Sequence, residues 1–198
     1  MKQNFDKRIY DIKTFKRDLK DSVDHYSELR AAKKSGRISK AFNERICLAV
    51  TQVTGCAICS FVHTKTALRS GMSKDEIEGF LAGEFGAAPQ EEMVALLFVQ
   101  HYAETKSNPD PETWQRVVDT YGPEAAQDIR AILRMIMVGN LHGNTIEALR
   151  KRLSGNSAPN SSIWQELGVV LGIFVFYPWY ILRRILSPKA KTSKATLN

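Results

Sequence analysis

Cysteine is scarce in this chain of 198 residues, which contains only three. So few cysteines exclude a disulfide-rich secreted scaffold. They fit a reducing compartment, where a cysteine pair is usually catalytic or redox-active. The first residues lack the apolar stretch of a secretory signal, so we expect a cytoplasmic protein. No stretch alternates convincingly between polar and apolar residues, and this predicts an all-α fold.

The sequence also lacks the motifs of several common enzyme classes and shows no internal repeat. It contains no phosphate-binding loop, no dinucleotide fingerprint and no Ser-His-Asp pattern. We therefore predict no cofactor.

Acidic residues are almost missing from the C-terminal flank. Residues 150–198 carry 8 Lys and Arg against 1 Asp or Glu, and residues 1–40 carry 12 against 6. Residues 41–149 are acidic, with 8 against 14. Basic flanks indicate either an anionic partner, for which we favour a lipid surface over nucleic acid, or an ordinary solvated charged face.

The chemically active side chains are concentrated in one motif, Cys-x-x-Cys-x-x-x-His, formed by Cys56, Cys59 and His63. Gly55 interrupts an apolar run and no Pro or Gly follows until Gly71, so a helix is predicted between them with Cys56 in its first turn. Side chains three and four positions apart share one helix face. The N-terminus of a helix favours thiolate over thiol, so the motif indicates a reactive dithiol beside an imidazole.

Two simpler interpretations compete with a redox-active dithiol. A zinc site would need a second pair of ligands, and inert buried cysteines are common. The remaining candidate ligands lack pair spacing: Cys47, His25, His101 and His142. We favour the dithiol and predict no metal. Cys47 is interpreted as core filling, and His101 and His142 as packed or surface histidines.

Glu44 lies twelve positions before Cys56, on the preceding predicted helix. The complete pattern, Glu-x11-Cys-x-x-Cys-x-x-x-His, resembles the carboxymuconolactone decarboxylase superfamily, in its alkylhydroperoxidase D-like (AhpD-like) branch. The segments from Ala67 to Ile77 and from Leu96 to Pro109 are similar to the helices that follow the motif in that family. The likeness covers about residues 38–152.

The resemblance implies an AhpD-like helical bundle that reduces hydroperoxides with its own dithiol. In this scheme Cys59 attacks the peroxide, Cys56 resolves the product into a disulfide, and His63 and Glu44 form a proton relay. It also implies a small hydroperoxide substrate, an external thiol or dithiol reductant, and a homo-oligomer. The decarboxylase branch does not use this dithiol. Two alternatives remain: disulfide exchange with a protein or lipoyl-type dithiol, and a membrane-associated module that senses oxidation or supports assembly without turnover.

The helix pattern divides the chain into four parts: 1–37, 38–152, 153–162 and 163–198. The first contains an amphipathic helix predicted over 5–29, which docks on the core or on a neighbouring subunit, followed by a basic loop over 31–36. The second is the catalytic domain and the third is a Ser- and Asn-rich linker. Within the catalytic domain we predict helices over 39–53, 55–70, 91–106 and 124–152, one that starts at Ser73, and one that starts at Asp110 and ends near Gly122-Pro123.

The tail over 163–186 contains a sixteen-residue apolar run from Leu167 to Leu182. A helix that spans a bilayer needs about 20 apolar residues, so this run is short for a span. Pro178 is also expected to kink the helix. The tail is also rich in aromatic residues that favour a membrane interface and in nearby cations. We predict a peripheral anchor on the inner face of the membrane, with a contact between subunits as the alternative.

Overall fold

The structure, a computed structural model, describes residues 5–159 and 161–186, and within them it contains eight α-helices, one 3-10 helix and no strand. The elements are α1 (Ile12–Asp24), α2 (Tyr26–Ser35), α3 (Lys40–Thr54), α4 (Ala57–Arg69), α5 (Lys74–Ala82), η1 (Gln90–Glu92), α6 (Met93–Glu104), α7 (Pro111–Leu153) and α8 (Ile163–Leu186). The predicted all-α class is confirmed.

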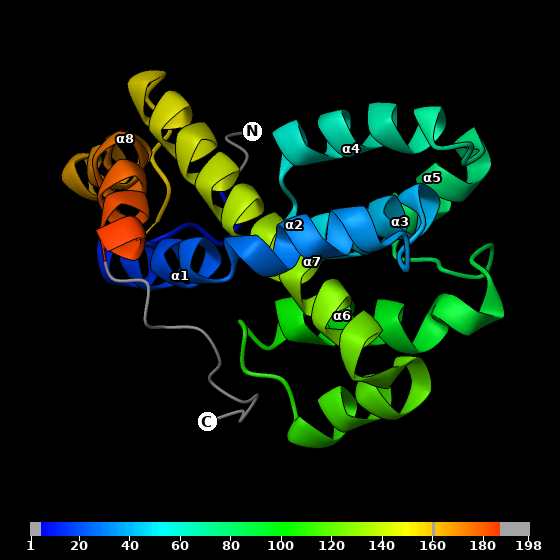
Figure 1. The fold of residues 1–198 in the computed structure, drawn as a ribbon. Coiled ribbons are helices and arrows are strands. Elements are labelled where there is room, and N and C mark those ends of the chain that lie inside the picture. Colours follow the sequence, from blue (N-terminus) through cyan, green and yellow to red (C-terminus); the bar gives the residue numbers. More distant parts are fainter. Residues whose placement is uncertain (1–4, 160, 187–198) are drawn as a thin grey trace.

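Helix α7 is the central element of the fold. It contacts α1, α2, α3, α4, α6 and α8, and Figure 1 shows it running diagonally through the molecule with α8 on one side and α4 on the other. Its inward residues, such as Ile129, Leu133 and Leu141, are completely buried. The predicted break near Gly122-Pro123 is confirmed as a kink inside α7. Gly122 has φ 76° there, a conformation that glycine adopts without strain.

The helix starts follow the predicted caps. The Ser73 side chain accepts a hydrogen bond from the backbone N–H of Glu76, and the Asp110 side chain accepts one from Glu112, with Pro111 in the first turn of α7. Such caps satisfy backbone donors that the helix itself leaves unpaired.

The N-terminal prediction was partly wrong, because one helix over 5–29 and a loop over 31–36 are replaced by an extended segment and two helices. Asp11 caps α1 through the N–H of Thr14, so the helix begins only at Ile12. The extended segment before it is held by long-range contacts, including the bond from the Tyr10 N–H to Thr145 Oγ1. His25 separates α1 from α2, and α2 continues to Ser35.

The predicted docking of the N-terminal apolar stripe on the core is confirmed. Phe15, Leu19 and Val23 are buried on the inner face of α1. At roughly 1.5–3 kcal/mol for each large apolar side chain, burial of this face ties the N-terminal part firmly to α7 and α8.

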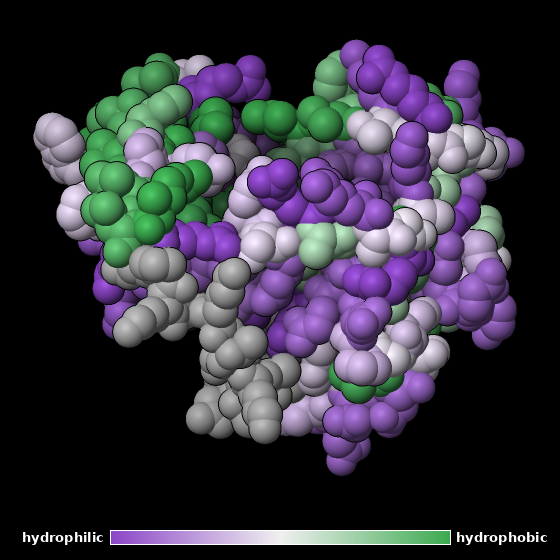
Figure 2. All heavy atoms as spheres, in the orientation of Figure 1, coloured by the Kyte–Doolittle hydropathy of each residue, from purple (hydrophilic) through white to green (hydrophobic). Residues whose placement is uncertain are grey.

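Helix α8 folds back onto α1 and α7 and continues through Pro178. Glu166 in its first turn is fully buried and accepts two hydrogen bonds from Arg152, at 2.8 and 2.9 Å. This pair joins the end of α7 to the start of α8 across the predicted linker. The outward face of α8 is apolar, and Figure 2 shows the apolar surface gathered over it.

Candidate functional site

The Cys-x-x-Cys motif begins at a sharp turn between α3 and α4. Gly55 ends α3 with φ 67°, a left-handed conformation that costs other residues energy, and its N–H donates to Thr51 O at 2.8 Å. Cys56 is the N-cap of α4 and not part of its first turn, so the helix starts two residues later than predicted. Its Sγ accepts a hydrogen bond from the backbone N–H of Cys59 at 3.3 Å. The turn therefore places one sulfur at the positive end of a helix.

The two motif cysteines are free thiols whose sulfurs lie 2.6 Å apart. Donation from the Cys59 thiol, helped by the backbone N–H groups of Cys59 and Ile58, lowers the pKa of Cys56 to about 7. The pKa of Cys59 is raised, because its proton is held against the Cys56 sulfur and because it is partly buried. The pair thus holds one proton between two sulfurs near neutral pH, with the resting negative charge on Cys56.

Access to the two sulfurs is unequal. Cys56 is 1% exposed, whereas Cys59 is half-buried one turn further along α4. The sulfur that carries the resting charge is therefore not the one that a ligand reaches most easily.

Glu44 of α3 and His63 of α4 form a hydrogen-bonded pair between the two helices. His63 Nδ1 lies 2.8 Å from Glu44 Oε2, and Asn43 Nδ2 donates to the other carboxylate oxygen at 2.8 Å. Glu44 is 5% exposed. When Glu44 is ionised, it holds the proton of His63 on Nδ1 and leaves Nε2 as a base. His63 follows Cys59 by four residues, which places the two on one face of α4.

Cys47 lies closer to these groups than the sequence indicated. Its sulfur and the ligand atoms of Glu44 and His63 lie within 4.8 Å of one another. Burial and the neighbouring Glu44 carboxylate raise the pKa of the Cys47 thiol. The sequence did contain a signal for the proximity of Glu44 and Cys47, because the two residues are three positions apart on α3. The third partner comes from α4, so the group appears only when the two helices are packed together.

Two asparagines of α7 support the turn that carries Cys56. Asn140 Nδ2 donates to Thr51 Oγ1 at 3.1 Å and to Thr54 Oγ1 at 2.9 Å, and Asn144 Nδ2 donates to Thr54 O at 2.8 Å. Asn140, Asn144, Thr51 and Thr54 are buried. Sequence reasoning missed this network. The signal for it was an asparagine directly after each of two glycines in an apolar helix, Gly139-Asn140 and Gly143-Asn144.

Gly143 of α7 lies against the dithiol. A Cβ atom at this position would stand 2.7 Å from Cys56 Sγ and 3.7 Å from Cys59 Sγ, whereas a Cβ at Gly139 would meet nothing within 4 Å. The close contact therefore occurs at Gly143 only, and its partner is the cysteine pair.

Replacing Gly143 by alanine should displace Cys56 Sγ from its place at the start of α4. We expect Gly143→Ala to lower the free energy of unfolding by about 1–3 kcal/mol, whereas Gly139→Ala should raise it by roughly 0.5–1 kcal/mol, because alanine favours a helix. Denaturant unfolding of the two reduced variants measures both effects. In Gly143→Ala the pH at which the dithiol is alkylated at half its maximal rate should also rise above about 7. Equal stability of the two variants would contradict the close contact.

His101 and His142, which we interpreted as packed or surface histidines, are not part of the group formed by Glu44, Cys47 and His63. His101 Nε2 accepts a hydrogen bond from the backbone N–H of Asp110 at 3.2 Å. His142 stacks on Phe15, with ring centroids 5.8 Å apart.

Residues 18–100 match the model of the Carboxymuconolactone decarboxylase family. The matched segment contains Glu44, Cys56, Cys59 and His63, and the match confirms the family predicted from the motif. This segment of the chain is similar to that family, which includes decarboxylases and alkylhydroperoxidases. No match was found among curated proteins or among solved structures.

Proposed function

We propose that this protein is a thiol-dependent peroxidase of the AhpD-like type, which reduces hydroperoxides through Cys56 and Cys59. The observation that carries the proposal is the contact between the two sulfurs at the start of α4, beside the His63–Glu44 pair. Two thiols in contact can give up two electrons and close into a disulfide with little movement, as a peroxide reduction requires.

Cys59 is the attacking sulfur in this proposal because it is the more exposed of the two. Its proton passes to His63 or to the Cys56 thiolate, and the Cys59 thiolate then attacks one oxygen of ROOH. The O–O bond breaks, the alkoxide takes back the proton that Cys59 gave up and leaves as ROH, and Cys59 becomes a sulfenic acid. The Cys56 thiolate then attacks that sulfur and forms the disulfide, and the displaced hydroxide takes a proton from solvent and leaves as water. An external dithiol reduces the disulfide and is itself oxidised.

His63 and Glu44 form the proton relay. Glu44 fixes the tautomer of His63 and stabilises its protonated form when it takes a proton. Both oxygens of Glu44 are already hydrogen-bonded, and the raised pKa of Cys47 opposes the thiolate that a metal would need. We therefore assign Glu44, Cys47 and His63 to proton handling and packing, not to a metal ion.

A steady-state assay tests the function. Reduced protein with hydrogen peroxide or an alkyl hydroperoxide and a dithiol reductant should consume peroxide over many turnovers. Exchange with disulfide substrates without peroxide consumption would favour the disulfide-exchange function. Oxidation of one equivalent without turnover would favour a sensing module.

An apolar surface on α4, beside the dithiol, is suited to contact with another protein molecule. Ile58, Phe61 and Val62 on α4 are each about half exposed or more. We propose that this surface contacts a neighbouring subunit, as the family resemblance implies, or a partner dithiol protein.

We also propose that this protein is cytoplasmic and that the outward face of α8 holds it at a membrane surface. Within the described residues, α8 is the one helix long and apolar enough to span a bilayer by length and composition. However, its other face packs on α1 and α7, and it carries the buried Glu166, so peripheral attachment fits better than a span. Trp164, Phe174 and Trp179 are each more than half exposed, and aromatic side chains of this kind favour the interface.

Replacing Trp164, Phe174 and Trp179 together by glutamine should release the protein from anionic liposomes. We expect at least a tenfold loss of binding in a sedimentation assay, because about 150–250 Å² of apolar surface is removed per aromatic ring. Glutamine at Leu97 and Leu153, two exposed apolar residues of other helices, is the matched control. Unchanged liposome binding with a broken oligomer would instead identify α8 as a subunit contact.

A further inference from the structure

A cavity whose wall contains no residue of α3 or α4 lies beside α7 in the described part of the chain. Its volume is about 540 Å³, within the range of about 300–1,000 Å³ typical of small-molecule sites, and α1, α2, α7 and α8 line it. Gly139 lines the cavity, whereas Gly143, one turn further, contacts the sulfur of Cys56. The cavity and the dithiol site therefore have different lining residues and lie one turn apart along α7.

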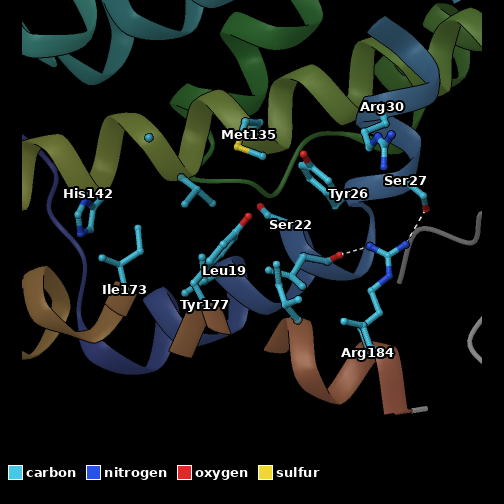
Figure 3. Close-up of a pocket in the computed structure, with 15 residues that line it drawn as sticks. Leu19, Ser22, Tyr26, Ser27, Arg30, Met135, His142, Ile173, Tyr177 and Arg184 are labelled. Carbon is cyan, nitrogen blue, oxygen red and sulfur yellow. Dashed lines mark hydrogen bonds between the residues drawn. The ribbon is translucent and has the colours of Figure 1, made fainter. Parts of the chain in front are cut away.

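Most of the cavity wall is apolar, and one end of it is cationic. Leu19, Val138 and Ile173 are among the apolar lining residues, while Arg30 and Arg184 lie together at one end (Figure 3). Such a wall suits a long hydrocarbon chain that carries an anionic group at its end.

The two arginines have no carboxylate partner within ion-pair distance among the described residues. Arg184 donates to Val23 O and to Ser27 Oγ, which are neutral acceptors. The nearby carboxylates of Asp21 and Glu28 pair with Arg134 on the other side of α1 and α2. That leaves two guanidinium groups at the same opening, an arrangement that attracts a carboxylate.

Two polar atoms of residues that line the cavity also lack a hydrogen-bond partner among the described residues. They are Ser22 Oγ and His142 Nε2, and both are buried. Figure 3 shows Ser22 near the middle of the cavity and His142 at the end away from the arginines. Both atoms are closed off from the cavity as the side chains stand, so a rotation of Ser22 or His142 toward the cavity would bring its polar atom to an oxygen of the occupant.

We propose that this cavity binds a single-chain fatty acid that carries an oxygen substituent on its chain. The carboxylate would lie at Arg30 and Arg184, the chain would follow the apolar wall, and a hydroxyl or hydroperoxyl group would pair with Ser22 or His142. This is a binding site separate from the dithiol, and it does not depend on the peroxidase function proposed above.

Displacement of a fluorescent fatty acid from the full-length protein tests the site, with saturated fatty acids of increasing length and 12-hydroxystearate as competitors. We expect binding of one molecule per chain, a gain of about fourfold in affinity per added methylene until the cavity is filled, and tighter binding of 12-hydroxystearate than of stearate. Repeating the titration on the Cys56→Ser/Cys59→Ser double variant should give the same affinities, so failure of the peroxidase chemistry would not affect this result.

Four variants test the site. Gly139→Phe should abolish binding by filling the cavity, whereas Gly139→Ala should not, because a Cβ there meets nothing. Arg30→Ala should weaken binding of the acid by at least tenfold and leave a fatty alcohol unaffected. Ser22→Ala should reduce the preference for 12-hydroxystearate over stearate. Binding that persists in Gly139→Phe, or that occurs only with phospholipid vesicles, would overturn the proposal.

Discussion

Replacing Cys59 by serine is expected to abolish peroxide consumption, and replacing Cys56 by serine should leave a sulfenic acid that can be trapped on Cys59. The reason is that Cys59 is the more accessible sulfur, while Cys56 lies under Gly143 and is 1% exposed. Mass spectrometry after labelling with a dimedone reagent measures both outcomes. Each variant should remain folded, because serine is close to cysteine in size and can also accept the hydrogen bond at the start of α4.

The electrostatics of the reduced pair provide a strict test of this assignment. Because the pKa of Cys56 is lowered to about 7 and that of Cys59 is raised, Cys56 carries the negative charge before any peroxide arrives. For Cys59 to attack, its proton must first leave, and the Cys56 sulfur at 2.6 Å is one acceptor. Cys47→Ser is the matched control, since it alters the third cysteine only. A dimedone adduct found mainly on Cys56 in the Cys59→Ser variant would reverse the roles of the two sulfurs.

The features of the site that the sequence predicted are those set by local geometry. The spacing of Cys56, Cys59 and His63 predicted a shared helix face because an α-helix repeats every 3.6 residues. The cap at Ser73 and the break at Gly122 were also predicted, because each depends only on a few neighbouring residues. The resemblance added Glu44, and the structure places its carboxylate against His63.

The features that the sequence did not predict depend on contacts between distant segments. Gly143 lies more than eighty positions from Cys56, and nothing in its immediate neighbourhood specifies that it faces a cysteine pair. The extended segment before α1 was predicted as helix because its apolar spacing suits one. Its bonds to Thr145 and Asn144 of α7 give the chain a better alternative. Local propensity is a weak preference when tertiary contacts oppose it.

Replacing Glu44 by glutamine is expected to lower the rate of peroxide reduction by roughly 10²-fold or more, the usual size of a general acid–base contribution, without unfolding the protein. Glutamine has the shape of glutamate, and its amide oxygen can still accept the proton of His63 Nδ1, so the tautomer is kept. What is lost is the negative charge that stabilises His63 once it has taken a proton.

The pH–rate profile distinguishes this relay from a structural role of Glu44. If Glu44 acts through His63, the profile of Glu44→Gln should change in shape, and Glu44→Gln/His63→Asn should be little slower than His63→Asn alone, because the two residues act as one unit. A structural role would instead lower the rate equally at every pH and make the two losses additive. Glu124→Gln, which removes an exposed carboxylate from the start of the second part of α7, is the control for loss of charge. An unchanged profile in Glu44→Gln would remove Glu44 from the mechanism and leave His63 to act alone.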